Sequence, residues 1–83
     1  MQGRRVYPDD QGSLRMAEGD YGKDGRGVWN VRPPGCHAGG IPKHEVTEHE
    51  DGTITVSPSI LLEPGNGEQG WHGYLEHGVW RTC

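Results

Sequence analysis

Hydrophobic and polar residues alternate most clearly near the C-terminus, over residues 71–83. Within this stretch His77 and Gly78 form a two-residue turn signal between two β-prone runs, which is typical of a β-hairpin. A turn at these positions places Leu75 directly opposite Trp80, and directly opposed residues share one face of a sheet. We therefore predict that Leu75 and Trp80 face the core. Four side chains are predicted on the opposite face: His72, Tyr74, Arg81 and Cys83.

The middle of the chain has the pattern of a second hairpin. Residues 41–50 can form a strand, and the Asp51-Gly52 pair that follows them is a strong hairpin signal. Residues 53–56 alternate again and are predicted to be the returning strand. The first strand is rich in Glu and His. We interpret it as a solvated edge strand whose charges discourage edge-to-edge pairing.

Proline and glycine interrupt the pattern on either side of this hairpin. Pro58 is expected to end the ladder or to lie at an edge, because proline has no N–H group to donate. The short apolar segment 59–62 continues until Pro and Gly break it at 64–67. Nearer the N-terminus, residues 28–31 form a short β-prone run, which Pro33-Pro34-Gly35 stops.

Residues 1–27 show neither a strand period nor a helix period. Six of them are glycine, and the few apolar residues are isolated among Arg, Asp and Ser. Such a segment cannot bury enough apolar surface to offset the entropy lost on ordering. We predict that residues 1–27 are a flexible arm, or one that orders only against a partner, and that residues 28–83 form a small β domain. The predicted fold class is all-β, a small antiparallel sheet of two hairpins plus a short strand.

The composition predicts a thin core. Only 30% of the 83 residues are hydrophobic, Phe is absent, and Gly and Pro together account for 21 positions. A short chain of this kind needs further support, from a metal, a disulfide, an oligomer or a larger assembly. Because large apolar residues are so few, we assign Trp29 and Trp80 to the core and leave Trp71 open.

The charge and hydropathy of the chain exclude two classes of partner. The net charge is −4 and no basic stripe is present, which argues against nucleic-acid binding. No apolar run reaches the roughly 18 residues that span a bilayer, and the N-terminus lacks the apolar stretch of a signal peptide. We therefore expect a cytoplasmic protein, in which Cys36 and Cys83 are reduced thiols or metal ligands rather than a structural bridge.

Cysteine and histidine provide the clearest candidate chemistry. Zinc takes four such ligands in a tetrahedron, and a core-poor domain gains folding energy by binding one. The candidate zinc ligands are Cys36, His37, His72 and Cys83, with His44, His49 and His77 in reserve. Adjacent Cys and His residues do not have the usual spacing of a zinc knuckle. In the alternative interpretation, Cys36 packs as a small hydrophobic residue and the histidines are solvated.

No complete catalytic set can be recognised. A Cys36 nucleophile needs a base and an orienting partner, and these usually come from separate elements rather than from the neighbouring His37. We therefore predict a protein that is not an enzyme. Trp, Tyr and Arg are favoured anchors at protein interfaces. The candidate partner-binding residues are Trp71, Tyr74 and Arg81.

Three short motifs carry a family resemblance. They are Gly35-Cys36-His37-Ala38-Gly39, then Asp51-Gly52-Thr53 with Pro58-Ser59-Ile60, and finally the hairpin over residues 71–80. Over residues 35–80 the chain resembles DUF6527, a family of small uncharacterised proteins of bacteria and phages. The resemblance implies a metal-binding β module in which Cys36 and His72 are ligands. The family has paired cysteines where this chain has Cys36-His37, and a further cysteine where this chain has Gln-Gly-Trp at 69–71.

Two functions from different classes follow from these observations. The first is a non-catalytic protein-binding module of a phage-encoded kind, which acts by contact with a host protein or a larger assembly. The second is a small zinc protein whose metal is structural rather than catalytic. Chelator distinguishes the two, because only the second needs metal to fold.

Overall fold

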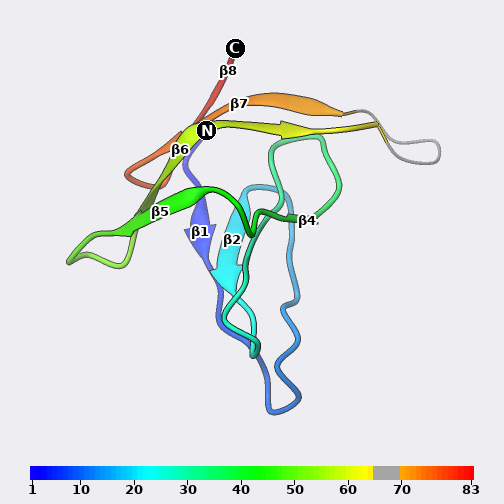
Figure 1. The fold of residues 1–83 in the computed structure, drawn as a ribbon, viewed down its shortest axis with the longest axis vertical. Coiled ribbons are helices and arrows are strands. Elements are labelled where there is room, and N and C mark those ends of the chain that lie inside the picture. Colours follow the sequence, from blue (N-terminus) through cyan, green and yellow to red (C-terminus); the bar gives the residue numbers. More distant parts are fainter. Residues whose placement is uncertain (65–69) are drawn as a thin grey trace.

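The computed structural model describes residues 1–64 and 70–83, which form eight strands and no helix. The strands form two sheets of four (Figure 1). The N-terminal sheet contains β1 (Arg4–Arg5), β2 (Asp20–Lys23), β3 (Trp29–Val31) and β4 (Gly39–Gly40). The C-terminal sheet contains β5 (Glu45–Glu48), β6 (Ile54–Leu62), β7 (Trp71–Glu76) and β8 (Val79–Thr82). The predicted all-β class is confirmed, with β1–β2 as a parallel pair among antiparallel ones.

The C-terminal hairpin has the predicted register. Leu75 lies opposite Trp80, and both are buried. Both turn residues have positive φ, 47° at His77 and 76° at Gly78, as the tight turns that suit a twisted hairpin require. Glycine is needed at position 78 for a second reason, since a Cβ there would lie 2.8 Å from the Tyr21 hydroxyl.

The second hairpin is also confirmed, and β5 is an edge strand of the C-terminal sheet. The Asp51 carboxylate closes its turn by accepting hydrogen bonds from the backbone N–H of Thr53 at 3.0 Å and from the Thr53 hydroxyl at 2.6 Å. The ladder between β5 and β6 ends at Ser57, next to Pro58, as predicted, although β6 itself continues to Leu62 in its pairing with β7. The break predicted at 64–67 falls mostly outside the described residues.

Pro58 is accommodated by an irregularity in the pairing of β6 with β7. Val56 pairs with Leu75 and Ile60 with Gly73, so four steps along β6 correspond to two along β7. The extra residues bulge out of the ladder, and within a bulge a residue need not donate a hydrogen bond. The proline is exposed there, and its peptide bond with Ser57 is cis.

The core lies between the two sheets. Tyr21 and Val31 enter it from the N-terminal sheet, and the buried side chains of β6, β7 and β8 enter it from the other. Trp80 is 3% exposed, as predicted. Trp29 is only partly buried at the margin of the core, where Arg5 and Lys23 lie over its ring at 5.0 and 5.3 Å.

The prediction of a flexible arm over residues 1–27 is not confirmed. Tyr21, inside that segment, is 1% exposed. The Trp80 indole Nε1 donates to the carbonyl of Gly19 at 2.9 Å, and the backbone N–H of Trp80 donates to the carbonyl of Met1 at 2.8 Å. The N-terminus lies beside β8, and Figure 1 shows β1 and β2 side by side below it. The first residues therefore join the two sheets.

Sequence patterns miss this segment because its strands are short and bury few large side chains. In β2 only Tyr21 contributes a large apolar group to the core. Gly22 is required by close approach, since a Cβ there would lie 2.3 Å from the carbonyl oxygen of Val6. The buried Asp20 carboxylate accepts hydrogen bonds from Arg4 at 3.1 Å and from the backbone N–H of Ala17 at 2.9 Å.

Candidate interaction surface

The loop that carries Cys36 and His37 is held by its own protein contacts. Cys36 is 5% exposed, and its carbonyl accepts a hydrogen bond from Arg32 Nε at 3.1 Å. The two ring nitrogens of His37 each lie 3.1 Å from a backbone carbonyl oxygen, of Ala38 and of Glu63. These contacts account for both nitrogens through which His37 would bind a metal.

The other two predicted ligands lie together on the C-terminal hairpin. Cys83 follows β8 and donates its backbone N–H to the carbonyl of His72 at 3.1 Å, as the predicted register requires. Both side chains are exposed, and His72 Nε2 lies 3.1 Å from the hydroxyl of Ser59. The cysteines form no disulfide with each other.

The four candidate ligands do not assemble into one site. Within residues 1–64 and 70–83, no three His, Cys, Asp or Glu side chains come together in a way that could bind a metal ion. The four-ligand zinc set predicted from the sequence therefore does not fit this arrangement of donors.

The reserve histidines connect strands and turns. His44 Nε2 lies 3.1 Å from the carbonyl of Ser59, and His49 Nε2 lies 2.7 Å from the Thr55 hydroxyl. The rings of His49 and His77 stack, with centroids 3.8 Å apart and planes 11° from parallel. This stack joins the turns of the two hairpins.

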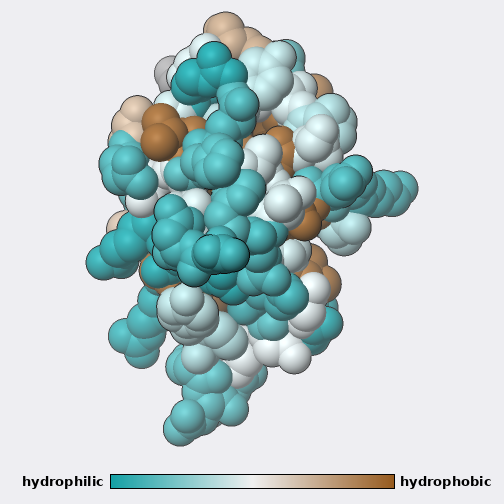
Figure 2. Space-filling view, turned by 90° about the vertical axis from the view of Figure 1, so that its left-hand side faces the viewer, coloured by the Kyte–Doolittle hydropathy of each residue, from teal (hydrophilic) through white to brown (hydrophobic). Residues whose placement is uncertain are grey.

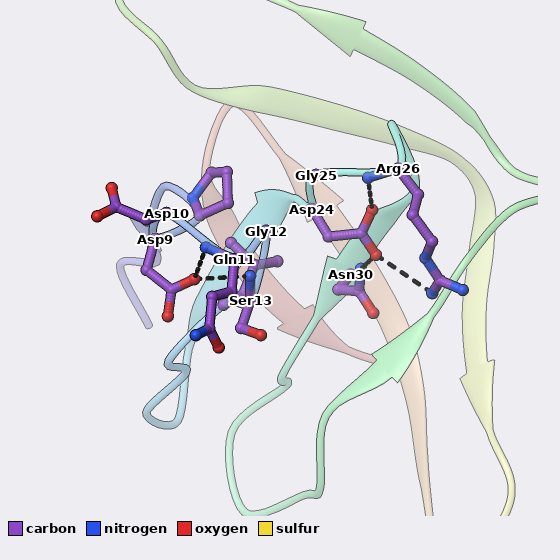
Figure 3. Close-up of a pocket in the computed structure, with 11 residues that line it drawn as sticks. Asp9, Asp10, Gln11, Gly12, Ser13, Asp24, Gly25, Arg26 and Asn30 are labelled. Atoms are coloured by element: carbon purple, nitrogen blue, oxygen red, sulfur yellow. Dashed lines mark hydrogen bonds and ion pairs between the residues drawn. The ribbon is translucent and has the colours of Figure 1, made fainter.

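A wide, open cavity of about 820 Å³ lies between the loops at 8–14 and 24–30 (Figure 3). Three aspartates line it, and two of them close their own loops. Asp9 Oδ1 accepts hydrogen bonds from two backbone N–H groups, those of Gln11 and Ser13. Asp24 Oδ1 accepts hydrogen bonds from the backbone N–H groups of Arg26 and Val28. The hydrogen bond from Val28 is the main reason why the pKa of Asp24 is lowered.

These carboxylates thus shape the loops rather than point jointly at a ligand. The sequence signal for both loops is an aspartate followed closely by glycine, which is typical of turns in which the side chain bonds to the backbone ahead of it. The signal predicts turns only, and does not by itself show that residues 1–27 are ordered.

The most exposed apolar groups of the C-terminal sheet share one side of it. We call this side the outer face and define it by the outward side chains of β6, β7 and β8 and of the residue after β8. Its members are Thr55, Ser57, Leu61, His72, Tyr74, Glu76, Val79, Arg81 and Cys83, and Glu45 and Thr47 of the edge strand β5 lie on the same side. Leu61 is 58% exposed, Tyr74 39% and Val79 38%.

Figure 2 shows the molecule from the left of Figure 1, where hydrophobic residues appear only as small separate patches among hydrophilic ones.

Tyr74 and Arg81 form the centre of the outer face. They lie directly opposite each other on β7 and β8, and the Arg81 guanidinium carbon lies 5.4 Å from the centroid of the Tyr74 ring. Arg81 also forms an ion pair with Glu76. Beside them lies an open groove of about 420 Å³, whose other wall is the bulged stretch 55–59 of β6.

The predicted partner-binding set is therefore divided between two faces. Tyr74 and Arg81 are on the surface together, as predicted. Trp71 lies on the inner side of β7 and packs edge-on against Trp80, with ring centroids 5.3 Å apart. Gly73 makes room for it, since a Cβ at that position would lie 2.5 Å from the Trp71 ring. Trp71 thus extends the core.

Comparison with models of known protein families, with curated protein sequences and with solved structures yields no significant match to this chain. The resemblance to DUF6527 stays a prediction. The described residues contain no helix long and apolar enough to cross a membrane.

Proposed function

We propose that this protein is a non-catalytic protein-binding module. It acts by contact with another protein, a host protein or a component of a larger assembly, through the outer face of its C-terminal sheet. The observation that supports this proposal is the exposed stack of Arg81 on Tyr74, with Leu61 and Val79 on the same face.

Tyr74 and Arg81, at the centre of the outer face, belong to two residue types that are common in the cores of protein interfaces. Tyr and Arg are enriched at protein interfaces and contribute a large share of binding energy where they become desolvated. The Arg81 guanidinium lies over the Tyr74 ring and pairs with Glu76, so these three side chains already contact one another on the free surface. Side chains that are ordered before binding lose less entropy in the complex. They stand on paired strands, which keep their spacing rigid.

Capture of partners by matched variants tests this proposal. We expect wild-type protein to capture a defined partner that Tyr74→Ala fails to capture. With that partner purified, calorimetry should show Tyr74→Ala weakening binding by about 30-fold or more, the effect of a hot-spot residue of about 2 kcal/mol.

The matched control is Tyr7→Ala. Tyr7 is 69% exposed and has an arginine, Arg5, over its ring at 5.1 Å, but it is remote in sequence from the outer face and follows β1. This variant should bind like the wild type. Equal binding by Tyr74→Ala and wild type would contradict the proposal, as would equal losses in Tyr74→Ala and Tyr7→Ala.

A further inference from the structure

We infer that this protein has a second binding site, an open groove beside β1 that binds a dianionic phosphate group. The groove shares no residue with the outer face, so the inference is independent of the proposed function. Its volume is about 410 Å³, which is within the range of small-molecule sites. Figure 1 shows this part of the chain running down from β1 and returning toward β2. The polar and aromatic lining residues are Arg4, Arg5, Tyr7, Asp9, Ser13 and Arg15.

The first reason is the sign of the charge in the groove. Three arginines and one aspartate line it, which gives a formal charge of +2 on a chain whose net charge is −4. The cavity between the loops at 8–14 and 24–30 has the opposite sign, because three aspartates and one arginine line it. The groove beside Tyr74 is lined by one charged residue of each sign. Of these three hollows, the groove beside β1 is therefore the one that attracts an anion.

The second reason is that Arg15 has no partner of its own. Its side chain is exposed, and within residues 1–64 and 70–83 it forms no hydrogen bond, ion pair or ring contact. A guanidinium has five N–H donors in a planar fork that matches the oxygens of a phosphate. All five donors of Arg15 are therefore free to bind a ligand.

Arg4 adds donors from the neighbouring strand. Its side chain is 71% exposed, and its Nη2 donates to the buried carboxylate of Asp20 at 3.1 Å, which leaves four of its five N–H donors for a ligand. Arg5 is different, because its two terminal nitrogens donate to the Gly52 carbonyl and to Glu48. Arg4 and Arg15 are therefore the residues expected to bind the anion.

The number of donors favours a phosphate group over a carboxylate. At pH 7 a phosphate monoester carries close to two negative charges and has three strong acceptor oxygens, whereas a carboxylate has one charge and two oxygens. Two guanidinium groups with most of their donors unused suit the larger charge and the larger number of oxygens. The Tyr7 ring, 69% exposed in the same groove, offers an apolar surface to the group that carries the phosphate.

The exposure of the groove sets the expected affinity. Both arginines are in contact with solvent, where charge pairs are weak and salt screens them. We therefore expect a dissociation constant on the order of 1 mM for inorganic phosphate at low salt.

A titration followed by backbone-amide NMR tests the inference on the full chain. Inorganic phosphate, phenyl phosphate and acetate are added separately at an ionic strength of about 20 mM, where screening is small. Both phosphates should shift the signals of residues 4–7 and 13–15 saturably, and acetate should bind at least about tenfold more weakly. Tighter binding of phenyl phosphate would identify the ligand as a monoester whose carrier contacts Tyr7. Equal binding of the two would identify it as inorganic phosphate.

Three variants locate the site. Arg15→Gln should weaken the binding of phosphate about fivefold or more, because it removes the free guanidinium. Arg26→Gln changes the net charge equally, and Arg26 is 83% exposed but lines the other cavity, so this control should bind phosphate like the wild type. Asp9→Asn keeps an oxygen for the N–H groups of Gln11 and Ser13 but removes a negative charge, so it should bind phosphate about two- to fivefold more tightly.

The inference is wrong if phosphate causes no saturable shift up to about 20 mM, or if acetate binds as tightly as phosphate. It is also wrong if Arg15→Gln and Arg26→Gln weaken binding equally, because phosphate would then respond only to net charge. Circular dichroism checks that each variant folds. Arg15 is preferred to Arg4 for the test, since Arg4→Gln would take an ion-pair partner from the buried Asp20 carboxylate.

Discussion

Tyr21 shows how one buried residue links the two sheets and makes the fold sensitive to pH. Its ring is 1% exposed between the sheets, and its hydroxyl lies against Gly78 in the last turn. Burial raises the pKa of Tyr21 above its usual value of about 10, and the positive charge of Arg5 partly offsets this increase. The folded state therefore favours the neutral phenol.

From this shift we predict alkaline destabilisation that Tyr21→Phe relieves. Because the folded pKa is the higher one, the contribution of Tyr21 to the free energy of unfolding is complete below about pH 10 and is lost as the pH rises through the folded value. We expect the free energy of unfolding of the wild type to fall relative to that of Tyr21→Phe as the pH rises from 8 to 11. Denaturant unfolding of both proteins measures it. Tyr7→Phe, at an exposed position, should follow the wild type. If the free energies of unfolding of wild type and Tyr21→Phe change with pH in the same way, the prediction is wrong.

At the scale of single elements, the turn between β5 and β6 depends on one carboxylate. Hydrogen bonds from the hydroxyl and then the backbone N–H of Thr53 lower the pKa of Asp51, and the nearby His49 contributes in the same direction. A lowered folded pKa means that the stability contributed by Asp51 is present above about pH 3.9 and is lost as the pH falls through the folded value.

We predict that Thr53→Val raises the pKa of Asp51 toward its ordinary value. Valine has nearly the same shape as threonine but cannot donate the 2.6 Å hydrogen bond. A carboxyl-carbon NMR titration measures the shift directly. The stability difference between wild type and Thr53→Val should shrink as the pH falls below about 4, since protonated Asp51 gains little from the hydroxyl. Thr47→Val, the same substitution at an exposed position of β5, is the control and should leave the pKa of Asp51 unchanged. If Asp51 has the same pKa in Thr53→Val as in the wild type, the Thr53 hydroxyl does not lower the pKa of Asp51.

The two hairpins were predictable because the residues that specify them are close in sequence. His77-Gly78 and Asp51-Gly52 require turns of known geometry, and the turn then sets the register of both flanking strands. The outer placement of Tyr74 and Arg81 followed from that register alone.

The remaining elements depend on contacts between residues far apart in the chain. β1 and β2 are a parallel pair closed over a loop of more than a dozen residues, and β2 is ordered by the core that it helps to form. Other parts of the chain approach the backbone closely at Gly19, Gly22 and Gly78, but a sequence alone does not say which atoms approach. The continuation of β6 past Pro58 likewise needed the partner strand β7.

At the scale of the whole molecule, residues 1–27 are predicted to be essential for folding. Their removal would take away β1, β2 and the Tyr21 ring, together with the Gly19 and Met1 carbonyls to which Trp80 donates hydrogen bonds. A chain of residues 28–83 should lose the cooperative urea transition followed by tryptophan fluorescence. In the full chain, Tyr21→Ala should cost about 3–5 kcal/mol, and Tyr7→Ala less than about 1 kcal/mol. A cooperative transition in the truncated chain would mean that β3 to β8 suffice for folding.

The stability of the whole molecule is also predicted to be independent of metal. A structural zinc contributes on the order of 10 kcal/mol to folding. For a domain of this size each 1 kcal/mol changes Tm by about 4–8 °C, so removal of such a metal would abolish the transition. The four candidate ligands are dispersed: Cys36 is buried in its loop, His37 contacts two carbonyls, and only His72 and Cys83 are neighbours. The two-sheet core, tied together through Met1, Gly19 and Trp80, carries the fold instead. We therefore expect EDTA to leave Tm unchanged, as measured by calorimetry on protein purified without a His tag. The prediction is wrong if mass spectrometry finds one zinc ion per chain and if chelation removes both the zinc and the unfolding transition. The Cys36 loop would then have to contact the C-terminal hairpin.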